Sequence, residues 1–530
     1  MKRSKILAVI MSVTLLMTAC GTTKSEPKDS SVPSKNAGIS NGGVEIALSD
    51  HGISVDGVSI SSDPAAAVYA ANDIVYYESG KDFTYGEGTA TDAHSVDDGA
   101  AHTVVHITKP GTYSVSGTLS QGQIAVDLGG DAEENPDAVV TLILNGVDIT
   151  CEVAPAVIFY NVYECGSSDE EAAAKDVDTS AAGANVIIAD GTTNTVNGSY
   201  VARIYKPDSV ILNEDGTEVK EAKKLHKYDA AFYSKMSMNV GGEKEGTGIL
   251  NINAENEGLD SELHLTINGG NINIRSGNDG INTNEDGVSV TTVNGGSLII
   301  KVTGETGEGD GIDSNGWLVI NGGTVVAAAC ANSADAGIDS DMGVHINGGT
   351  VIASGHMLDH IEDGGQTYAT FSFAQKQAGS EKLSLKNESG EVVMELCPEN
   401  DYSILVYSSP NLMPGTYTLW SNEQQMVGQS GGMVGGPGMP NSGPVGMMPP
   451  ELPENMVPPK GEPTFEGVEP PRGEFSPGQQ PPAEGDRPER PDMPGKAPWK
   501  PGFNGEAQEL AADFHISDGA NMFLGVSPVK

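Results

Sequence analysis

Short stretches in which apolar and polar residues alternate recur along the middle of the chain at a nearly constant interval. Leu265-Thr266-Ile267, Leu318-Val319-Ile320 and Val344-His345-Ile346 each run into an Asn-Gly-Gly triplet, and another alternating stretch follows. The triplets recur at spacings of 26, 27 and 26 residues, beginning at Asn268, Asn294, Asn321 and Asn347. Alternation with a period of two is typical of β-strands. The pattern therefore predicts short strands in repeating units.

Self-similarity at this period predicts a solenoid in which each repeat packs only against its neighbours. We expect an all-β protein whose body is a parallel β-helix. Alternation directs one set of side chains into the core: Leu265, Ile267, Leu318, Ile320, Val344 and Ile346. It directs another set outward: His264, Thr266, Val319 and His345. The stacked asparagines are expected to form an amide ladder at a corner, where the glycines permit positive φ.

An acidic turn lies upstream of each first strand, as in Asp310-Gly311-Ile312-Asp313-Ser314-Asn315. Stacked strands lie about 4.8 Å apart, so equivalent turns place like charges in columns that repel unless a cation shares them. Asp, Asn and backbone oxygens suit Ca²⁺. The predicted calcium ligands are Asp260, Asp279, Asn282, Asn284, Asp310, Asp313, Asn315, Asp335, Asp339 and Asp341. The alternative is a solvated acidic turn that only aids solubility.

Composition divides the chain into six predicted segments. These are a lipoprotein signal peptide over 1–19, a flexible tether over 20–45, the parallel β-helix over 46–365, a small C-terminal β cap over 366–426, a Met-, Pro- and Gly-rich disordered insertion over 427–508 and a terminal strand pair over 509–530. Two polar insertions, Gly166 to Gly183 and Asn213 to Lys227, are expected to loop outward from the corners. Pairing among Cys151, Cys165, Cys330 and Cys397 stays open.

The first residues have the pattern of an export signal. Basic Lys2, Arg3 and Lys5 precede an apolar run from Ile6 to Met17, and small residues then lead into Cys20. This ending resembles the lipobox of bacterial lipoproteins, which implies that Cys20 is lipidated and becomes the first mature residue. A plain signal peptide is the alternative. We expect a monomer that is held by its lipid at the extracellular face of the bacterial cell membrane.

Charge restricts the possible partners. The 29 Lys and Arg residues against 73 Asp and Glu residues give a net charge of −44. Such a charge repels nucleic acid and anionic lipid surfaces, so a nucleic-acid partner is excluded. It would also repel a polyanionic polysaccharide unless divalent cations lie between the two.

Several stretches together resemble a known family. They are Ile107 to Tyr113, Val140 to Ile149, Asp229 to Lys235, Asp310 to Asn315, Asn347 to Gly349 and Ser408 to Leu412. They are similar to the clostridial-type carbohydrate-binding right-handed parallel β-helix proteins, which are calcium-dependent surface binders of cellulose and pectic acid similar to pectate lyases. The resemblance covers roughly residues 65–425. It implies a right-handed helix, calcium at the acidic turns and polysaccharide on an outer sheet. Ala336 departs from the acidic column unless Asp335 substitutes for it.

Three functions remain open. The first is a non-catalytic surface protein that binds plant cell-wall glycans such as cellulose or polygalacturonate. Trp317 and Tyr233 are its predicted carbohydrate contacts, because Trp317 precedes an inward leucine and should project outward, where its ring can stack on a sugar. The second is a pectate lyase, which needs calcium and a Lys or Arg base. Its candidate bases, Lys235, Arg275 and Lys301, all lie outside the acidic turns. The third is a calcium-rigidified adhesin or scaffold.

Overall fold

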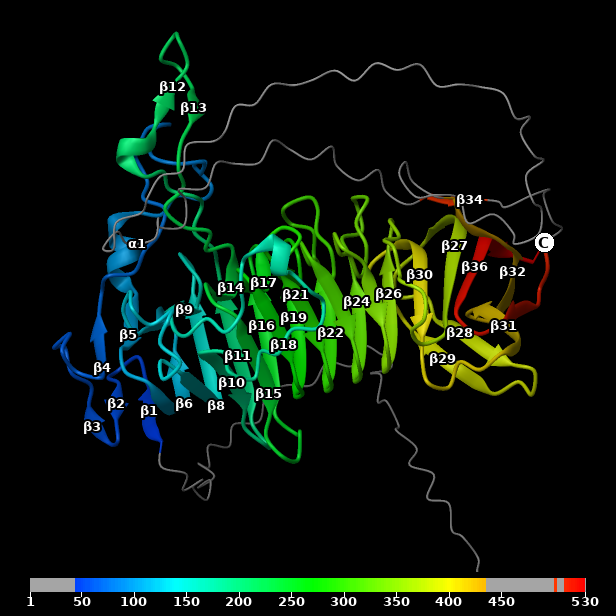
Figure 1. The fold of residues 1–530 in the computed structure, drawn as a ribbon, viewed down its shortest axis with the longest axis horizontal. Helices are drawn as coiled ribbons and strands as arrows, with labels where there is room; N and C mark the ends of the chain where they lie inside the picture. Colours follow the sequence, from blue (N-terminus) through cyan, green and yellow to red (C-terminus); the bar gives the residue numbers. More distant parts are fainter. Residues whose placement is uncertain (1–42, 435–499, 503–509, 530) are drawn as a thin grey trace, which may run out of the picture. The chain divides into compact units, whose positions relative to one another are not determined.

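The computed structural model describes residues 43–434, 500–502 and 510–529, and their regular secondary structure is almost entirely β-strand (Figure 1). Within this described part there is one short α-helix, α1 (Val96–Ala101), and two 3-10 turns, η1 (Glu170–Ala172) and η2 (Pro207–Ser209). The predicted signal peptide, most of the tether and most of the 427–508 insertion lie outside the described residues. β1 begins at Val44, slightly before the predicted boundary at residue 46.

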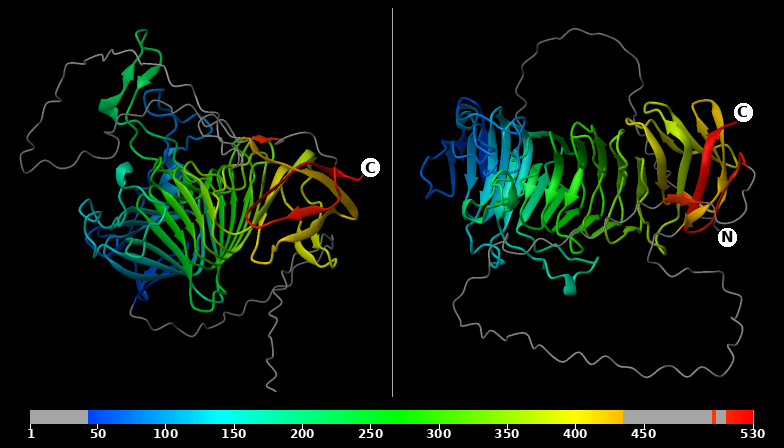
Figure 2. Two further views of the ribbon diagram at one scale, coloured as in Figure 1. Left: turned by 45° about the vertical axis from the view of Figure 1, so that its right-hand side comes forward. Right: turned by 90° about the horizontal axis from the view of Figure 1, so that it is seen from above.

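Three parallel ladders form the body of the protein (Figure 2). The first ladder contains β5 (Thr103–Ile107), β7 (Gly122–Asp127), β9 (Val157–Asn161), β14 (Ala230–Ser234), β17 (Glu257–Ser261) and β20 (Ile281–Thr283). The first ladder ends at β20, and the last two repeats continue it as turns rather than strands. β4 (Val68–Ala71) pairs antiparallel with β5 at its start. β2 (Ser54–Val55) and β3 (Val58–Ser59) form a hairpin that pairs antiparallel with β1 (Val44–Leu48). A second hairpin, β12 (Ile211–Leu212) with β13 (Val219–Glu221), lies outside the ladders.

The second and third ladders share the long strands at the start of the stack. The second contains β1 (Val44–Leu48), β6 (Gly111–Leu119), β8 (Val140–Cys151), β10 (Ala184–Ile188), β15 (Met238–Gly242), β18 (His264–Ile267), β21 (Val290–Val293), β23 (Trp317–Ile320) and β25 (Val344–Ile346). The third continues from β8 through β11 (Thr193–Gly198), β16 (Ile249–Ala254), β19 (Asn271–Ser276), β22 (Ser297–Val302), β24 (Thr324–Ala328) and β26 (Thr350–Gly355).

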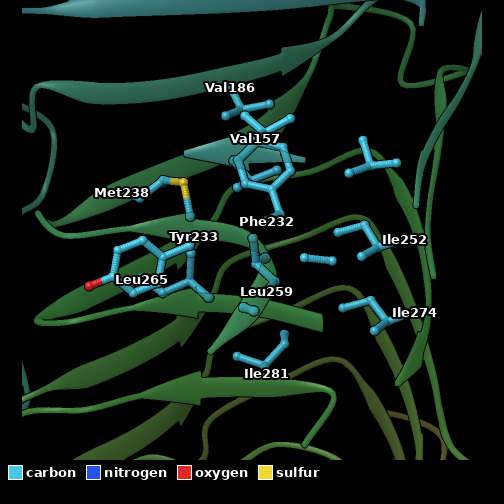
Figure 3. Close-up of a cluster of buried hydrophobic side chains, with 14 of the residues drawn as sticks. Val157, Val186, Phe232, Tyr233, Met238, Ile252, Leu259, Leu265, Ile274 and Ile281 are labelled. Atoms are coloured by element: carbon cyan, nitrogen blue, oxygen red, sulfur yellow. The ribbon is translucent and has the colours of Figure 1, made fainter. Parts of the chain in front are cut away.

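Apolar side chains fill the space between the ladders. Figure 3 shows Phe232, Leu259 and Ile281 one above the other, facing Ile252 and Ile274 of the third ladder. The residues predicted to point inward are at most 1% exposed, so that prediction is confirmed for Leu265, Ile267, Leu318, Ile320, Val344 and Ile346. Strands buried in this way gain their stability from apolar area removed from water.

The predicted asparagine ladder is confirmed. Asn294 donates to the Oδ1 of Asn268, Asn321 to that of Asn294, and Asn347 to that of Asn321, each over 2.9 Å. An amide can donate and accept at once, so identical residues satisfy one another in a stack. The second glycine of the triplet takes the left-handed conformation, with φ of 84° at Gly296, which a side chain would strain.

The outer face of the second ladder differs from the prediction. His264, Thr266 and Val319 were expected to face solvent, yet they are only 3%, 6% and 4% exposed. The insertion from residue 166 to 183 lies against part of this face, where the Thr179 hydroxyl is 2.7 Å from that of Thr266. The expectation that this insertion loops outward is therefore wrong. It has hydrogen-bonding partners on the sheet that local sequence patterns do not show.

Antiparallel pairing ends the stack. β26 pairs with β30 (Tyr402–Ser408), and β30 pairs with β27 (Tyr368–Gln377). Side chains of β27 and β30 belong to a second hydrophobic core, that of the cap. The remaining cap strands are β28 (Leu383–Asn387), β29 (Val392–Leu396), β31 (Gly415–Ser421), β32 (Gln424–Ser430), β35 (Phe514–Ile516) and β36 (Ala520–Pro528). A further pair joins β33 (Gly432–Val434) to β34 (Lys500–Gly502).

The cap extends beyond its predicted boundaries. β32 continues to Ser430, past residue 426, because it pairs with β36. The predicted terminal strand pair does not pair with itself, since β35 joins β31 while β36 joins β27 and β32. Cys151, Cys165, Cys330 and Cys397 are all free. Within the described residues, no helix has the length and apolarity required to span a membrane.

Truncating the asparagine ladder at different positions should have graded effects. Asn321→Ala removes two amide bonds and Asn347→Ala, at the end, removes one. At a net value of about 0.5 kcal/mol for each exposed bond, we expect losses of unfolding free energy near 1 kcal/mol and about half of that. Thermal unfolding followed by circular dichroism measures both. Equal effects, or none, would show that the ladder does not stabilise the stack.

Candidate functional site

The acidic turns stack because glycine allows their backbones to approach closely. A Cβ atom built at Gly258 would lie 2.5 Å from the carbonyl oxygen of Gly280, and one at Gly280 would lie 2.5 Å from that of Gly311. In the native chain these carbonyls instead accept hydrogen bonds, from the amide of Leu259 at 3.1 Å and from that of Ile281 at 3.2 Å. The glycines therefore fix the register of the polar residues on both sides of them.

Three columns of polar residues result from this register. We define the first as Glu257, Asp279 and Asp310, the second as Asp260, Asn282, Asp313 and Asp339, and the third as Glu262, Asn284, Asn315 and Asp341. Asp260 pairs directly with Asn282, and Ile281 forms a parallel bridge with Ile312. The amide of Asp339 continues the series by donating to the carbonyl of Ile312 at 2.7 Å. The stacking of equivalent acidic turns, which the repeat predicts, is therefore confirmed for Asp260, Asn282, Asp313 and Asp339.

Three carboxylates converge at one point of these columns. Asp310, Asp313 and Asp339 each offer one oxygen, and the three atoms lie within 4.8 Å of one another. We call them the aspartate triad. Asp310 is held in place because its Oδ1 accepts from the amide of Ala336 at 2.5 Å. In the same way, Asp279 accepts from the amide of Asp310 at 2.6 Å.

The protonation of these carboxyls is strongly perturbed. Burial is the main reason that the pKa of Asp279 rises to about 7, and nearby carboxylates add to the effect. Burial, followed by repulsion from Asp339, raises the pKa of Asp310 well above its ordinary value. The pKa of Asp313 rises in the same direction for the same kind of reason. Without a counter-charge, the stack favours protonated carboxyls.

A second group lies two repeats earlier in the stack. Glu257, Asp260 and Asn282, which we call the Glu257 cluster, are 6%, 0% and 8% exposed. Each has one buried oxygen without a hydrogen-bond partner: Glu257 Oε2, Asp260 Oδ2 and Asn282 Oδ1. Burial raises the pKa of both carboxyls well above the ordinary range, and neighbouring carboxylates raise it further. A buried acceptor with no donor destabilises the folded state. A proton on each carboxyl, or a cation bound to all three oxygens, would remove this cost.

The residues present fit a hard divalent cation. Both groups consist of carboxylate and amide oxygens, which are the ligands that Ca²⁺ prefers, with six to eight in its shell. The Asn282 amide nitrogen is directed to Glu257 Oε1 at 3.2 Å, which leaves the Asn282 oxygen available. Asn284 donates to Asp260 Oδ1 at 2.7 Å, which leaves Oδ2 available.

Other predicted ligands have different roles. Asp335 does not replace Ala336 in the first column, because its Oδ2 accepts from the amide of Gly309 at 2.7 Å. Asn315 donates to the carbonyl of Asn284 and to Asp286 Oδ1, each at 3.0 Å, so it links two turns. Asp341 is exposed at the outer edge of the third column.

Sequence reasoning missed several residues around the columns. Glu257 directly precedes Gly258, as Asp279 precedes Gly280, so alignment of the repeats on glycine would have found it. Arg203 and Lys227 had no such signal, because they reach the columns from a segment outside the repeats. Arg203 pairs with Asp229 at 3.1 Å, and Lys227 lies 3.5 Å from Glu262.

The two predicted sugar-binding aromatics differ in exposure. Tyr233 is 2% exposed, and its hydroxyl donates to Glu262 Oε1 at 2.8 Å. Its ring has no open face for a sugar, so the prediction of a carbohydrate contact at Tyr233 is corrected. The prediction failed because Tyr233 is in register with Asp260, the first residue of the second column, where the stack covers it. Trp317 is half-buried at the start of β23, two residues after Asn315.

The basic residues predicted for lyase chemistry lie away from the aspartate triad. Arg275 and Lys301 are neighbours in the third ladder, and both face Glu399, at 3.8 and 2.7 Å. Lys235 follows β14 in line with Glu262 of the third column. Burial alone would lower the pKa of Lys227, but Glu262 and other carboxylates raise it above its usual value overall.

The fold and the site define an all-β protein of stacked parallel ladders that carries buried columns of carboxylates. A model of the family described as carbohydrate-binding domain-containing protein matches residues 101–386, more than half of the chain. The chain belongs to this family.

Two known proteins show the extent of the similarity. A carbohydrate-binding domain-containing protein of Acetivibrio thermocellus is 30% identical over 174 residues, which is 32% of this chain and 45% of the relative. The chain thus matches less than half of that relative's length. A solved structure, described as a polysaccharide lyase-like protein from C. thermocellum in a gadolinium derivative, aligns with a TM-score of 0.34 and 21% identity. This alignment covers 58% of this chain and 90% of that one.

The raised carboxyl pKa values give a signed pH dependence in the absence of divalent cations. Between about pH 6.5 and pH 7 the folded protein still holds the Asp279 proton that the unfolded chain has released, and the raised pKa values of Asp310 and Asp313 act in the same direction, so stability falls as pH rises. Below about pH 6.5 the buried histidines His226 and His264, whose pKa values are lowered to about 4, act in the opposite direction.

Scanning calorimetry in EDTA should therefore show a melting temperature that decreases from about pH 6.5 upward. Asp313→Asn should flatten this slope, because it removes one of the buried groups. Asp215→Asn, in an exposed turn, is the control and should leave the slope unchanged. A melting temperature that is constant or rises over this range would contradict the burial of proton-holding carboxyls.

Proposed function

We propose that this protein is a non-catalytic, calcium-dependent polysaccharide-binding protein of the cell surface, built on a right-handed parallel β-helix. The observation that carries the calcium proposal is the set of buried oxygens in the Glu257 cluster that have no hydrogen-bond partner. Membership of a carbohydrate-binding family supports the polysaccharide. The parallel, in-register pairing of successive repeats supports the helix.

Two groups of residues would hold calcium. The aspartate triad supplies three carboxylates, and the Glu257 cluster supplies two carboxylates and an amide oxygen. When bound, Ca²⁺ neutralises the like charges that the stack forces together. The side chains of the triad are only half-buried. A site of this kind leaves room in the shell of six to eight oxygens for water or for oxygens of a ligand.

Bound calcium would also overcome the repulsion between this acidic protein and an acidic glycan. A net charge of −44 repels a uronate polymer, whereas bound cations at an exposed edge of the columns attract it. Polygalacturonate is therefore the polymer that this site favours, with cellulose as the neutral alternative. Trp317, close after the third-column residue Asn315, is the aromatic residue that we propose to contact the sugar.

The available bases favour binding over elimination. A lyase of this kind needs an unprotonated Lys or Arg beside the metal-bound uronate. Lys227 is kept protonated by its carboxylate neighbours, and Arg203 is paired with Asp229. Arg275 and Lys301 belong to a different ladder.

The cellular location is a separate part of the proposal and rests on sequence alone. Residues 1–19 are proposed to be removed as a signal peptide, and Cys20 is proposed to carry the lipid that holds a monomer at the outer face of the membrane. Both lie outside the described residues.

Affinity pull-down on polygalacturonate and on cellulose, with Ca²⁺ and with EDTA, tests the binding proposal. We expect retention on polygalacturonate in Ca²⁺, loss in EDTA, and no rise in ultraviolet absorbance from an unsaturated product. Asp313→Asn should weaken retention about tenfold or more, since it removes a charged ligand. Asp215→Asn should bind as the native protein does.

The other outcomes select the alternatives. Accumulation of unsaturated product in Ca²⁺ would identify a lyase, and Lys235→Ala would then be the first variant to assay. Failure to bind either polymer, with calcium still raising the melting temperature, would identify a calcium-rigidified scaffold.

Calcium and the Asp313→Asn substitution should each raise stability, because each removes the cost of burying the Asp313 carboxyl. In EDTA near neutral pH the variant should melt higher than the native protein, because the buried Asp313 carboxyl must take up a proton on folding and the amide need not. Calcium at about one hundred times its dissociation constant should stabilise the native protein by about 2.7 kcal/mol, and the variant by less. Asp313 is not a ligand if the variant has the lower melting temperature in EDTA and calcium raises that temperature by as much as it does for the native protein.

A further inference from the structure

The C-terminal cap carries an aromatic surface that the calcium-dependent function does not use. Strands β29, β28 and β31 form an antiparallel sheet in that order (Figure 1). One face of this sheet is buried in the cap core through Leu383, Leu385 and Leu419. On the opposite face, Glu395, Ser384 and Trp420 lie side by side across the three strands.

Trp420 is the central group of this outer face. Its side chain is half-buried, and its indole nitrogen donates to the hydroxyl of Thr418 at 2.9 Å. The Lys386 ammonium lies 4.5 Å from the centre of its ring. Ser384, between Trp420 and Glu395, is only 3% exposed, because the larger neighbouring side chains cover it. The indole is therefore held in a defined orientation on the surface.

A shallow groove crosses this surface on both sides of the indole. Two adjoining hollows share Trp420 and Lys386 in their walls. Lys382, Glu395 and Asn422 line the first hollow, and Asn387, Thr416 and Asp513 line the second. The groove thus extends past the ring in two directions, as an extended chain of sugars requires.

The chemistry of the groove matches a neutral sugar. A pyranose presents an apolar face of C–H groups that stacks on an indole, while its hydroxyls both donate and accept at the rim. In the first hollow, the positive charges of Lys382 and Lys386 are balanced by Glu395 and Glu423. Glu395 already pairs with Lys382 at 3.1 Å. These groups offer hydrogen bonds without the excess positive charge that a uronate would need.

We propose that the groove over Trp420 is a second, calcium-independent glycan site that binds a neutral hexopyranose chain. The sugar ring takes the face of the indole that Lys386 now contacts, and the Lys386 ammonium moves aside to the rim, since a cation–π contact at a partly exposed position is weak. Trp420 lies beyond residues 101–386, the part of the chain that matches the carbohydrate-binding family. The site is formed by cap strands and contains no residue of the three acidic columns.

Calorimetric titration of the full chain with a soluble cello-oligosaccharide in EDTA tests this site. We expect saturable binding that Trp420→Ala weakens at least about tenfold. Trp420→Phe keeps a flat ring and should stay within about threefold of the native protein. Asp215→Asn, in an exposed turn, is the control and should bind like the native protein.

Three results would overturn the proposal. They are no binding of the native protein in EDTA, equal binding by Trp420→Ala, or equal binding of an oligogalacturonate, which would contradict the neutral class of ligand. Melting temperatures of both Trp420 variants exclude unfolding as the cause of lost binding, and Trp420→Phe decides the test if Trp420→Ala is unstable. The calcium-dependent proposal is unaffected by these outcomes, because polygalacturonate retention in Ca²⁺ depends on Asp313 and not on Trp420.

Discussion

In-register stacking of equivalent turns is the constraint on which the rest of this structure depends. It places the same position of successive repeats about 4.8 Å apart, so every residue type is selected by how it interacts with a copy of itself. Isoleucine stabilises the stack by burial. Asparagine stabilises it because its amide donates to the equivalent asparagine of the preceding repeat and accepts from that of the following one. Aspartate is the residue for which this spacing is unfavourable.

The acidic columns therefore destabilise the stack, because they hold like charges close together. Solvent would weaken this repulsion if the carboxylates were exposed. Asp260 and Glu257 are instead buried, and each has an oxygen without a hydrogen-bond partner. Protons can relieve the repulsion, as the raised pKa of Asp279 indicates. A divalent cation would relieve it while the carboxylates stay deprotonated, and it would add an attraction for anions.

The repeats made much of this architecture predictable. Period and alternation were enough to place the asparagine ladder, the inward residues and the Asp260 to Asp339 column, because each depends only on equivalent positions. Contacts between distant segments were not predictable. Local sequence does not show that Thr179 reaches Thr266, that Lys227 reaches Glu262, or that β36 returns to complete the cap. Tyr233 was misjudged because exposure depends on what lies beside the column rather than on alternation.

The central claim is that these stacked carboxylates bind calcium. Anomalous diffraction from crystals grown with Ca²⁺ at neutral pH tests it most directly. The account predicts an anomalous peak bounded by oxygens of Asp310, Asp313 and Asp339, at the distances of about 2.3–2.6 Å that Ca²⁺ requires. Crystals that show no peak at the aspartate triad or the Glu257 cluster, under conditions where Ca²⁺ is present in excess, would contradict it.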